Sequence, residues 1–376
     1  MKYLDEYKIE TLVTRVGREI SEGLLPAAQI AIGYDKQIVF SKNFGDTKPN
    51  SLFCIFSATK AITSAASWLL MQDEIISEHD LVTDYIPEFG KNGKSKVTLS
   101  HLLTHTAGFP HAPFRPVEWR SKEARLARFE QWRIFWEPGT QFEYHPSSSM
   151  YVVAEIIERA SGTDFGDFVQ TRIFDPLQLS NSFIGLPDDQ GGRALAIKYC
   201  GEELSEQEYK EMGFPVPPET EVTEDAVLSF NETDVRASGI PGGGAFSNAE
   251  DMAIFYQALL HGGTDQERLW QEDILMSAKT IRNPELTDPV FKKAANRGLG
   301  IVISGDTDRN YRGFGKTNSP LAFGHNGAGG QLCWADPDTG LSFVYLTSGH
   351  DRNPIRQGRR GVSISSLAAE CKSRKR

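Results

Sequence analysis

Hydrophobic positions follow a helical period near the start of the chain and a strand pattern directly after it. Between Tyr7 and Leu25 the apolar residues recur every three or four positions, which predicts an amphipathic helix that Gly23 and Pro26 close. The next two apolar segments, 27–33 and 37–41, flank the polar triplet Tyr34-Asp35-Lys36 and predict a β-hairpin. We therefore expect sheet strands before the first buried helix.

The middle of the chain has a different pattern. From about residue 80 to residue 231 the strand signals fade, and loops rich in Pro and Trp alternate with helical stretches, the longest at Ser147–Arg159. Alternating apolar segments return at 331–336 and 341–347, on either side of a Pro337–Gly340 turn, and predict a second hairpin. Sheet strands at both ends with helices between them indicate an α/β protein with a mainly helical insertion.

Composition excludes several classes of function. The 376 residues are 39% hydrophobic and 24% charged with a net charge of −10, as in an ordinary globular protein that does not bind nucleic acid. No apolar run reaches 18 residues, so we expect no transmembrane helix, and the first residues lack the apolar core of a signal peptide, so we expect a cytoplasmic location. The four cysteines form no Cys-x-x-Cys pair, which indicates free thiols. Cys54 could be considered a nucleophile, but a small buried thiol is the preferred interpretation.

A serine and a lysine three residues apart stand at the start of the apolar run after the first hairpin. Residues i and i+3 share a helix face, so the Nζ of Lys60 can reach the Oγ of Ser57. A serine hydroxyl becomes a good nucleophile when a neighbouring base takes its proton, and a lysine with a lowered pKa can be that base. The spacing alone is common and also fits a helix cap beside a solvated lysine.

Three further features have a structural and a functional interpretation. His101 and His105 have metal-ligand spacing, but no third ligand accompanies them, so we favour structural histidines and predict no metal site. The glycines at 242–244 resemble a phosphate cradle without the Gly-Lys-Ser/Thr ending, so a tight backbone crossing is preferred. The acidic segment Cys200–Asp234 is expected to be a surface excursion, either a lid or a solvated loop.

The order of three motifs connects this chain with a known family. The motifs are Ser57-Ala58-Thr59-Lys60, Tyr144-His145-Pro146 and His325-Asn326-Gly327, with supporting signatures at 101–108 and 243–247. Together they resemble the serine β-lactamase and penicillin-binding protein superfamily, most closely the class C β-lactamase, D-Ala-D-Ala carboxypeptidase and family VIII carboxylesterase branch. The resemblance covers roughly residues 10 to 350. It implies a β-lactamase-like fold: an antiparallel sheet flanked by helices, with an inserted mainly helical domain.

The resemblance also implies a domain division and roles for the motif residues. Residues 1–80 and 236–376 would form the sheet domain and 81–235 the helical domain, with the active site in the cleft between them. Ser57 would be the nucleophile and Lys60 its base, and Tyr144 would protonate the leaving group. His325, at the family's Lys position, would donate to Tyr144 or to the substrate. The N–H groups of Ser57 and Ala328 would bind the oxyanion.

Departures from the family pattern suggest the substrate. Pro146 replaces an Asn whose amide would bind an acylamino side chain, and His325 replaces a lysine that would bind a carboxylate. We therefore expect a serine hydrolase of small carboxylic esters acting through acyl-Ser57, without a cofactor, with Asn326, Gly327, Pro146 and Trp119 contacting the substrate. A β-lactamase or D-amino-acid peptidase or amidase, an acyltransferase and a catalytically silent ligand-binding relative remain the alternatives. The oligomeric state is not predicted.

Overall fold

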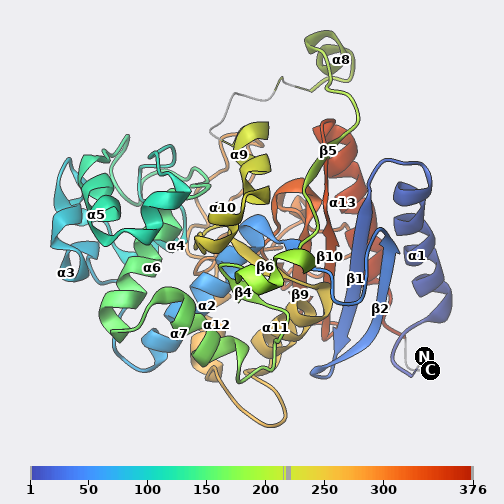
Figure 1. Cartoon of the computed structure of the whole chain (residues 1–376), viewed down its shortest axis with the longest axis horizontal. Coiled ribbons are helices and arrows are strands. Elements are labelled where there is room, and N and C mark those ends of the chain that lie inside the picture. The colour runs from blue at the N-terminus through green and yellow to red at the C-terminus, as the bar shows by residue number, and fades with distance from the viewer. Residues whose placement is uncertain (1, 215, 217–221, 374–376) are drawn as a thin grey trace.

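A six-stranded antiparallel sheet forms one half of the protein (Figure 1). The structure is a computed structural model that describes residues 2–214, 216 and 222–373. The strand order is β2-β1-β10-β9-β8-β7. The bounds are β1 Ala27–Tyr34, β2 Gln37–Gly45, β7 Val302–Ile303, β8 Phe323–Gly324, β9 Leu332–Asp336 and β10 Leu341–Thr347. The first strands of the chain therefore pair with the last ones, and Ile30 lies opposite Tyr345.

Helices cover both faces of the sheet, so its central strands are buried on both sides. Helices α1 (Glu6–Ser21) and α13 (Pro354–Ala369) pack together on one face, and α11 (Ala249–His261) packs on the other. Alternate residues of a strand point to opposite faces. Accordingly Ile30 and Tyr345 join the core under α1 and α13, whereas Ala31 and Val344 join the core on the α11 side.

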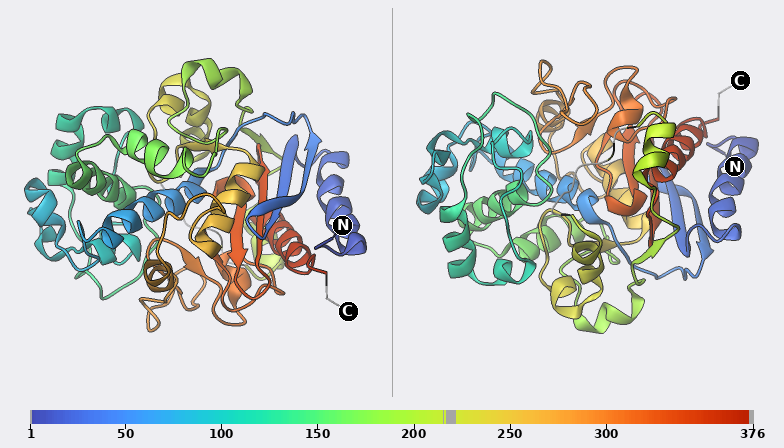
Figure 2. Two further views of the ribbon diagram at one scale, coloured as in Figure 1. Left: turned by 90° about the horizontal axis from the view of Figure 1, so that it is seen from below. Right: turned by 90° about the horizontal axis from the view of Figure 1, so that it is seen from above.

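The helical half lies beside the α11 side of the sheet (Figure 2). Its centre is α2 (Thr59–Gln72), where every residue from Thr59 to Leu70 is buried and which packs against α6 (Ser148–Ser161). The Gly162 residue ends α6 in a left-handed conformation. The remaining helices of this half are α3 Val82–Tyr85, α4 Leu99–Leu103, α5 Lys122–Gln131, α7 Phe165–Val169 and α12 Glu272–Ala278.

The acidic segment after residue 200 contains short helices as well as loops. Helices α8 (Glu206–Glu211), α9 (Glu224–Leu228) and α10 (Thr233–Ala237) lie in it, while residues 215 and 217–221 are outside the described residues. Before it, β5 (Lys198–Cys200) pairs with β11 (Gly349–Asp351). A third small sheet joins β3 (Phe53–Cys54), β6 (Ala245–Ser247) and β4 (Phe183–Ile184).

The predicted fold class, both hairpins and the helix at 147–159 are confirmed, with small shifts in bounds. The first helix ends at Ser21, four residues before the predicted end. Helix α13 was not predicted. None of the helices in the described part of the chain has the length and apolar character needed to cross a membrane.

Candidate active site

The Ser57 residue lies in a single 3₁₀ turn, Phe56–Ala58, that leads directly into α2. The turn follows strand β3, and the N–H of Ile55 donates to the carbonyl of Ala245 on the neighbouring strand β6. Phe56 has a φ of 45°, a left-handed conformation that is strained for a residue with a side chain. Such strain costs about 1–3 kcal/mol and concentrates at functional sites. The chain is therefore held in an unfavourable conformation immediately before Ser57.

The Lys60 side chain is fully buried and contacts three oxygen atoms. Its Nζ lies 3.2 Å from the Oγ of Ser57, 2.6 Å from the carbonyl oxygen of Pro146 and 2.7 Å from that of Gly242. The two carbonyls can only accept hydrogen bonds, so they take two N–H groups of the amine. In the neutral amine the remaining lone pair then faces Ser57, whose hydroxyl can donate to it. This arrangement would allow the neutral form of Lys60 to accept a proton from Ser57.

The environment of Lys60 favours that neutral form. Burial lowers the pKa of the Lys60 amine below its ordinary value of 10.5; the Tyr144 hydroxyl opposes the shift, and the positive charge of Arg297 adds to it. Pro146 contributes to the site in two ways: its carbonyl oxygen accepts a hydrogen bond from Lys60, and the residue lines the cleft.

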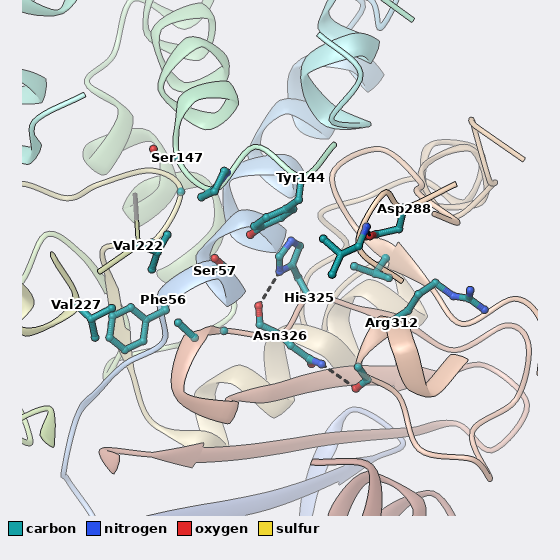
Figure 3. A pocket seen from close by; sticks show the side chains of 18 of the residues that line it. Phe56, Ser57, Tyr144, Ser147, Val222, Val227, Asp288, Arg312, His325 and Asn326 are labelled. Carbon is teal, nitrogen blue, oxygen red and sulfur yellow. Dashed lines mark hydrogen bonds between the residues drawn. The ribbon is translucent and has the colours of Figure 1, made fainter. Parts of the chain in front are cut away.

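The Tyr144 ring lies beside Lys60, with Nζ 5.2 Å from the ring centroid. It is half-buried and belongs to the segment that enters α6. The imidazole ring of His325 lies on another side, with the two ring centroids 6.0 Å apart. Figure 3 shows Ser57, Tyr144 and His325 around one cleft, although they come from separate parts of the chain. Lys60 joins them through its contacts with Ser57 and Tyr144.

Hydrogen bonding and burial define which His325 nitrogen carries the proton. The Nδ1 atom lies 2.8 Å from the carbonyl oxygen of Asn326, which can only accept, so Nδ1 carries a proton. Burial, with the charges of Lys60 and Arg297, lowers the pKa of His325 well below 6.5, so the ring is neutral. Its buried Nε2 has no partner and is an acceptor. In the neutral ring Nε2 can accept but not donate, so the geometry disfavours the predicted donation by His325 to Tyr144 or to the substrate, and that role stays a prediction.

The two predicted oxyanion donors lie in turns that leave their N–H groups without a partner inside the turn. Ser57 is the second residue of the 3₁₀ turn 56–58, and Ala328 is the first residue of the 3₁₀ turn 328–330. Gly327 permits their approach, because a Cβ there would lie 2.2 Å from the carbonyl oxygen of Ile55. Both residues line the same cleft.

The cleft has a volume of about 740 Å³ and two chemically different sides. Figure 3 shows Phe56, Val222 and Val227 on one side of Ser57, and Asp288 and Arg312 on the other side, beyond Tyr144 and His325. Phe230 extends the apolar side, since its ring packs 5.3 Å from that of Phe56. Residues from both predicted domains line the cleft.

The remaining predicted substrate contacts divide into two groups. Gly327 and Asn326 line the cleft, but the Asn326 amide is used within the protein: its Nδ2 donates to the Gly313 carbonyl at 2.7 Å and its Oδ1 accepts from the Cys333 N–H at 3.3 Å. Trp119 does not line the cleft. It is 6% exposed and packs in the core against Tyr151, so its predicted substrate contact is corrected.

Sequence reasoning missed Arg297. This residue lines the cleft, and its Cζ lies 5.6 Å from the Tyr144 ring centroid. Its buried Nε and Nη1 atoms have no hydrogen-bond partner. Burial lowers the pKa of its guanidinium, which nevertheless adds a positive charge to a site where no cation other than Lys60 was expected. No sequence pattern around Asn296-Arg297-Gly298 indicated it.

His101, His105 and the glycine run at 242–244 have contacts of the structural kind that the sequence predicted. The Nδ1 of His101 accepts from the Thr98 N–H at 3.1 Å and that of His105 accepts from the His145 N–H at 3.1 Å. A Cβ at Gly244 would lie 2.5 Å from the Ile240 nitrogen, as expected for a tight backbone crossing. Within the described residues, no three His, Cys, Asp or Glu side chains are grouped so that they could hold a metal ion. Cys54 is 3% exposed, and burial raises the pKa of its thiol to about 12.

Comparisons with known proteins agree with this architecture. The profile of the Beta-lactamase family matches residues 11–365. A Salmonella heidelberg (strain SL476) protein named "Putative D-alanyl-D-alanine carboxypeptidase" is 26% identical over 392 residues, covering 91% of this chain and 83% of that protein. A penicillin-binding protein homologue from Caulobacter crescentus has a TM-score of 0.79 and 23% identity, and a family VIII carboxylesterase has a TM-score of 0.77 and 23% identity. Each covers 96% of this chain and 97% of the other, and shows a shared fold.

Proposed function

Because this chain belongs to the beta-lactamase family and has its fold, we propose that it hydrolyses small carboxylic esters through an acyl intermediate on Ser57. The observation that carries the proposal is the position of Lys60. Two carbonyl oxygens occupy two of its directions and the Ser57 hydroxyl occupies the third, in an environment that favours the neutral amine.

Acylation follows from these contacts. Lys60 takes the proton of Ser57 as Oγ attacks the ester carbonyl carbon, and the carbonyl oxygen becomes an oxyanion that accepts hydrogen bonds from the Ser57 and Ala328 N–H groups. Tyr144 gives its proton to the departing alkoxide, which leaves as the alcohol. The ammonium of Lys60 then returns a proton to Tyr144, so both groups recover their starting forms.

Deacylation repeats these transfers with water. A water molecule attacks the acyl carbon and gives its proton to Tyr144, which passes its own proton to the neutral Lys60. The oxyanion donors bind the second tetrahedral intermediate. Ser57 leaves with a proton returned by Lys60, and the carboxylic acid is released. The acyl group ends in the product acid and Ser57 is regenerated.

The two sides of the cleft support an ester with an apolar acyl group. Tyr144 protonates the leaving group, so the alcohol part lies on its side, near Arg297 and Asp288. The acyl group is then directed towards Phe56, Val227 and Phe230. Burial of apolar surface contributes roughly 25 cal/mol per Å², so this side selects hydrocarbon chains. Neither Pro146 nor the internally bonded Asn326 amide offers a side-chain donor for an acylamino group.

A second candidate function is supported by Arg297. Its guanidinium lies near Tyr144, on the leaving-group side, and lines the cleft, where its positive charge would attract a carboxylate. A peptidase that releases a C-terminal D-amino acid has such a leaving group, and the Salmonella relative bears the name of such an enzyme.

One panel of substrates separates the two candidates. Purified protein and the Ser57→Ala variant are assayed with p-nitrophenyl acetate, butyrate and octanoate, with nitrocefin, and with an acylated D-Ala-D-Ala peptide. Ester hydrolysis by the wild type with kcat/KM at least about 100-fold above that for nitrocefin and the peptide supports the proposal. Preference for the peptide would instead establish the second candidate, and preference for nitrocefin would contradict both.

A further inference from the structure

Tyr144 is held from both sides by one residue. The carbonyl of His105 accepts a hydrogen bond from the N–H of Glu143 at 3.3 Å, and the Nδ1 of its side chain accepts one from the N–H of His145 at 3.1 Å. These are the residues directly before and after Tyr144. The imidazole ring also lies against the Tyr144 ring, with centroids 4.7 Å apart.

We propose that His105 is a positioning residue for Tyr144, which fixes the backbone on both sides of the tyrosine and thereby sets the place of its hydroxyl relative to Ser57 and Lys60. The inference rests on the proposed function because it assigns Tyr144 the proton transfers described above. A displacement of about 1 Å in such a group costs on the order of 100-fold in rate.

The hydrogen bonds require one tautomer of His105. A backbone N–H can only donate, so Nδ1 is unprotonated and the ring proton is on Nε2. A protonated ring would place an N–H against the N–H of His145 and break the contact. Burial, and then the charges of Arg297 and neighbouring groups, lower the pKa of His105 well below 6.5, so the neutral ring persists.

Three features of His105 are unfavourable for the stability of the fold. His105 is fully buried, its Nε2–H has no partner, and its backbone is left-handed with a φ of 59°. An unpaired buried donor costs about 1–3 kcal/mol. A residue chosen only to fill this space would not need the ring, so these costs indicate that the acceptor at Nδ1 is required.

A second histidine reinforces the same segment. The Nε2 of His145 accepts from the N–H of Phe109 at 3.2 Å, and its Nδ1 donates to the carbonyl of Glu143 at 2.7 Å. The segment 143–145 is therefore tied to the segment 105–109 by hydrogen bonds that avoid the Tyr144 side chain. The tyrosine ring is left to face the cleft, which it lines.

Three variants of His105 and one control variant separate the hydrogen-bond acceptor from the size of the side chain. His105→Asn places Oδ1 where Nδ1 was, and asparagine tolerates a left-handed backbone. His105→Leu has a similar size but no acceptor, and His105→Gly keeps the backbone freedom without an acceptor, which covers the case in which the leucine variant does not fold. His101→Leu is the matched control, since it removes a histidine of the same motif that bonds to Thr98 and not to the tyrosine segment.

The measurement is kcat and KM for p-nitrophenyl butyrate, with the rate of Ser57 labelling by a fluorophosphonate as a readout that needs no ester turnover. We expect His105→Leu and His105→Gly to lose about 100-fold in kcat with KM changed less than about threefold, and His105→Asn to retain most of kcat. His101→Leu should keep kcat within about twofold. If the fluorophosphonate labels Ser57 of the wild type but no ester is hydrolysed, the proposed function is contradicted. The labelling rates of the His105 variants, compared with the wild type, would then test the positioning role.

A double-mutant cycle distinguishes positioning from general destabilisation. If His105 acts through Tyr144, then His105→Leu should have little further effect on turnover or labelling in a Tyr144→Phe background, because residues acting as a unit are not additive. His105→Gly serves in the same cycle if the leucine variant does not fold. Full additivity of the two losses, a His105→Asn variant as impaired as His105→Leu, or unimpaired His105→Leu and His105→Gly variants would overturn the inference.

Discussion

The amine of Lys60 lies 3.2 Å from the hydroxyl of Ser57, and its other two directions are occupied by carbonyl oxygens. Carbonyls cannot donate, so in the neutral amine the two N–H groups are directed to them and the lone pair is left for a hydroxyl, with that of Ser57 at 3.2 Å. In the proposed mechanism, the carbonyls of Pro146 and Gly242 thus orient the buried lysine so that it can accept the proton of Ser57.

The pH dependence should report the lowered pKa of Lys60. Since the amine must be neutral to act as the base, kcat/KM should rise with pH and reach a plateau below the ordinary lysine value of 10.5. Activity is lost as the pH falls through the Lys60 pKa, because the ammonium cannot take the Ser57 proton. Lys60→Met should reduce kcat about 10²- to 10⁴-fold and abolish this limb, as measured by kcat/KM profiles from pH 5 to 10. If kcat/KM of that variant still fell at low pH in the same way, the acid limb would have to come from a titratable group other than Lys60.

Arg297 should contribute to the position of that limb, in addition to the larger effect of burial. Its positive charge disfavours the ammonium of Lys60, so Arg297→Gln should raise the pKa of Lys60 and move the acid limb to higher pH. Arg297→Lys is the matched control, because it retains a positive charge. A limb that stays in place in the glutamine variant, measured at equal ionic strength, would show that Arg297 does not act on Lys60.

Gly327 should be needed for its lack of a side chain. A Cβ there would lie 2.2 Å from the Ile55 oxygen, so Gly327→Ala must move the segment carrying the Ala328 N–H away from Ser57. We expect a loss of about 100-fold in kcat and about 1–3 kcal/mol in the free energy of unfolding. Gly191→Ala, where a Cβ meets nothing within 4 Å, should change neither. Denaturant unfolding and steady-state assays test both variants, and a fully active Gly327→Ala protein would rule out this role.

Phe230 should limit the length of the acyl chain. Its ring packs on Phe56 at the apolar side of the cleft, so Phe230→Ala should shift the preferred p-nitrophenyl ester from short chains towards octanoate, raising that ratio of kcat/KM at least about tenfold. Phe291→Ala removes an aromatic ring from the Asp288 side and should leave the chain-length preference unaltered. If Phe291→Ala changed the chain-length preference and Phe230→Ala did not, the acyl group would bind on the Asp288 side and the alcohol on the Phe230 side.

Much of the fold was predictable because its signals are local. The hairpin of β1 and β2 has a polar turn between apolar strands, and α6 has a helical period with a glycine end. Ser57, Lys60 and Tyr144 were recognisable from motif order. In the structure Ser57 and Tyr144 line one cleft, and the buried Lys60 amine contacts the Ser57 hydroxyl behind it. These features depend on residues close in sequence, where pattern and structure agree.

The missed features depend on contacts between distant residues. In α13, Gly358 and Gly361 interrupt the pattern, and the buried Arg360 is paired with Glu19 and Asp351, so a core position looks polar. The role of Arg297 arises only when its segment meets Tyr144. Whether an aromatic residue such as Trp119 lines the cleft or packs in the core is likewise a tertiary property that local sequence does not encode.

The most direct test of the account is detection of the acyl-enzyme. Protein mixed with p-nitrophenyl butyrate and quenched in acid within the first turnover should carry one butyryl group, and peptide mass spectrometry should place it on Ser57. The Ser57→Ala variant should carry none and should show no ester turnover above the uncatalysed rate. A butyryl group on another residue, or turnover that survives in Ser57→Ala, would contradict the acyl-Ser57 mechanism.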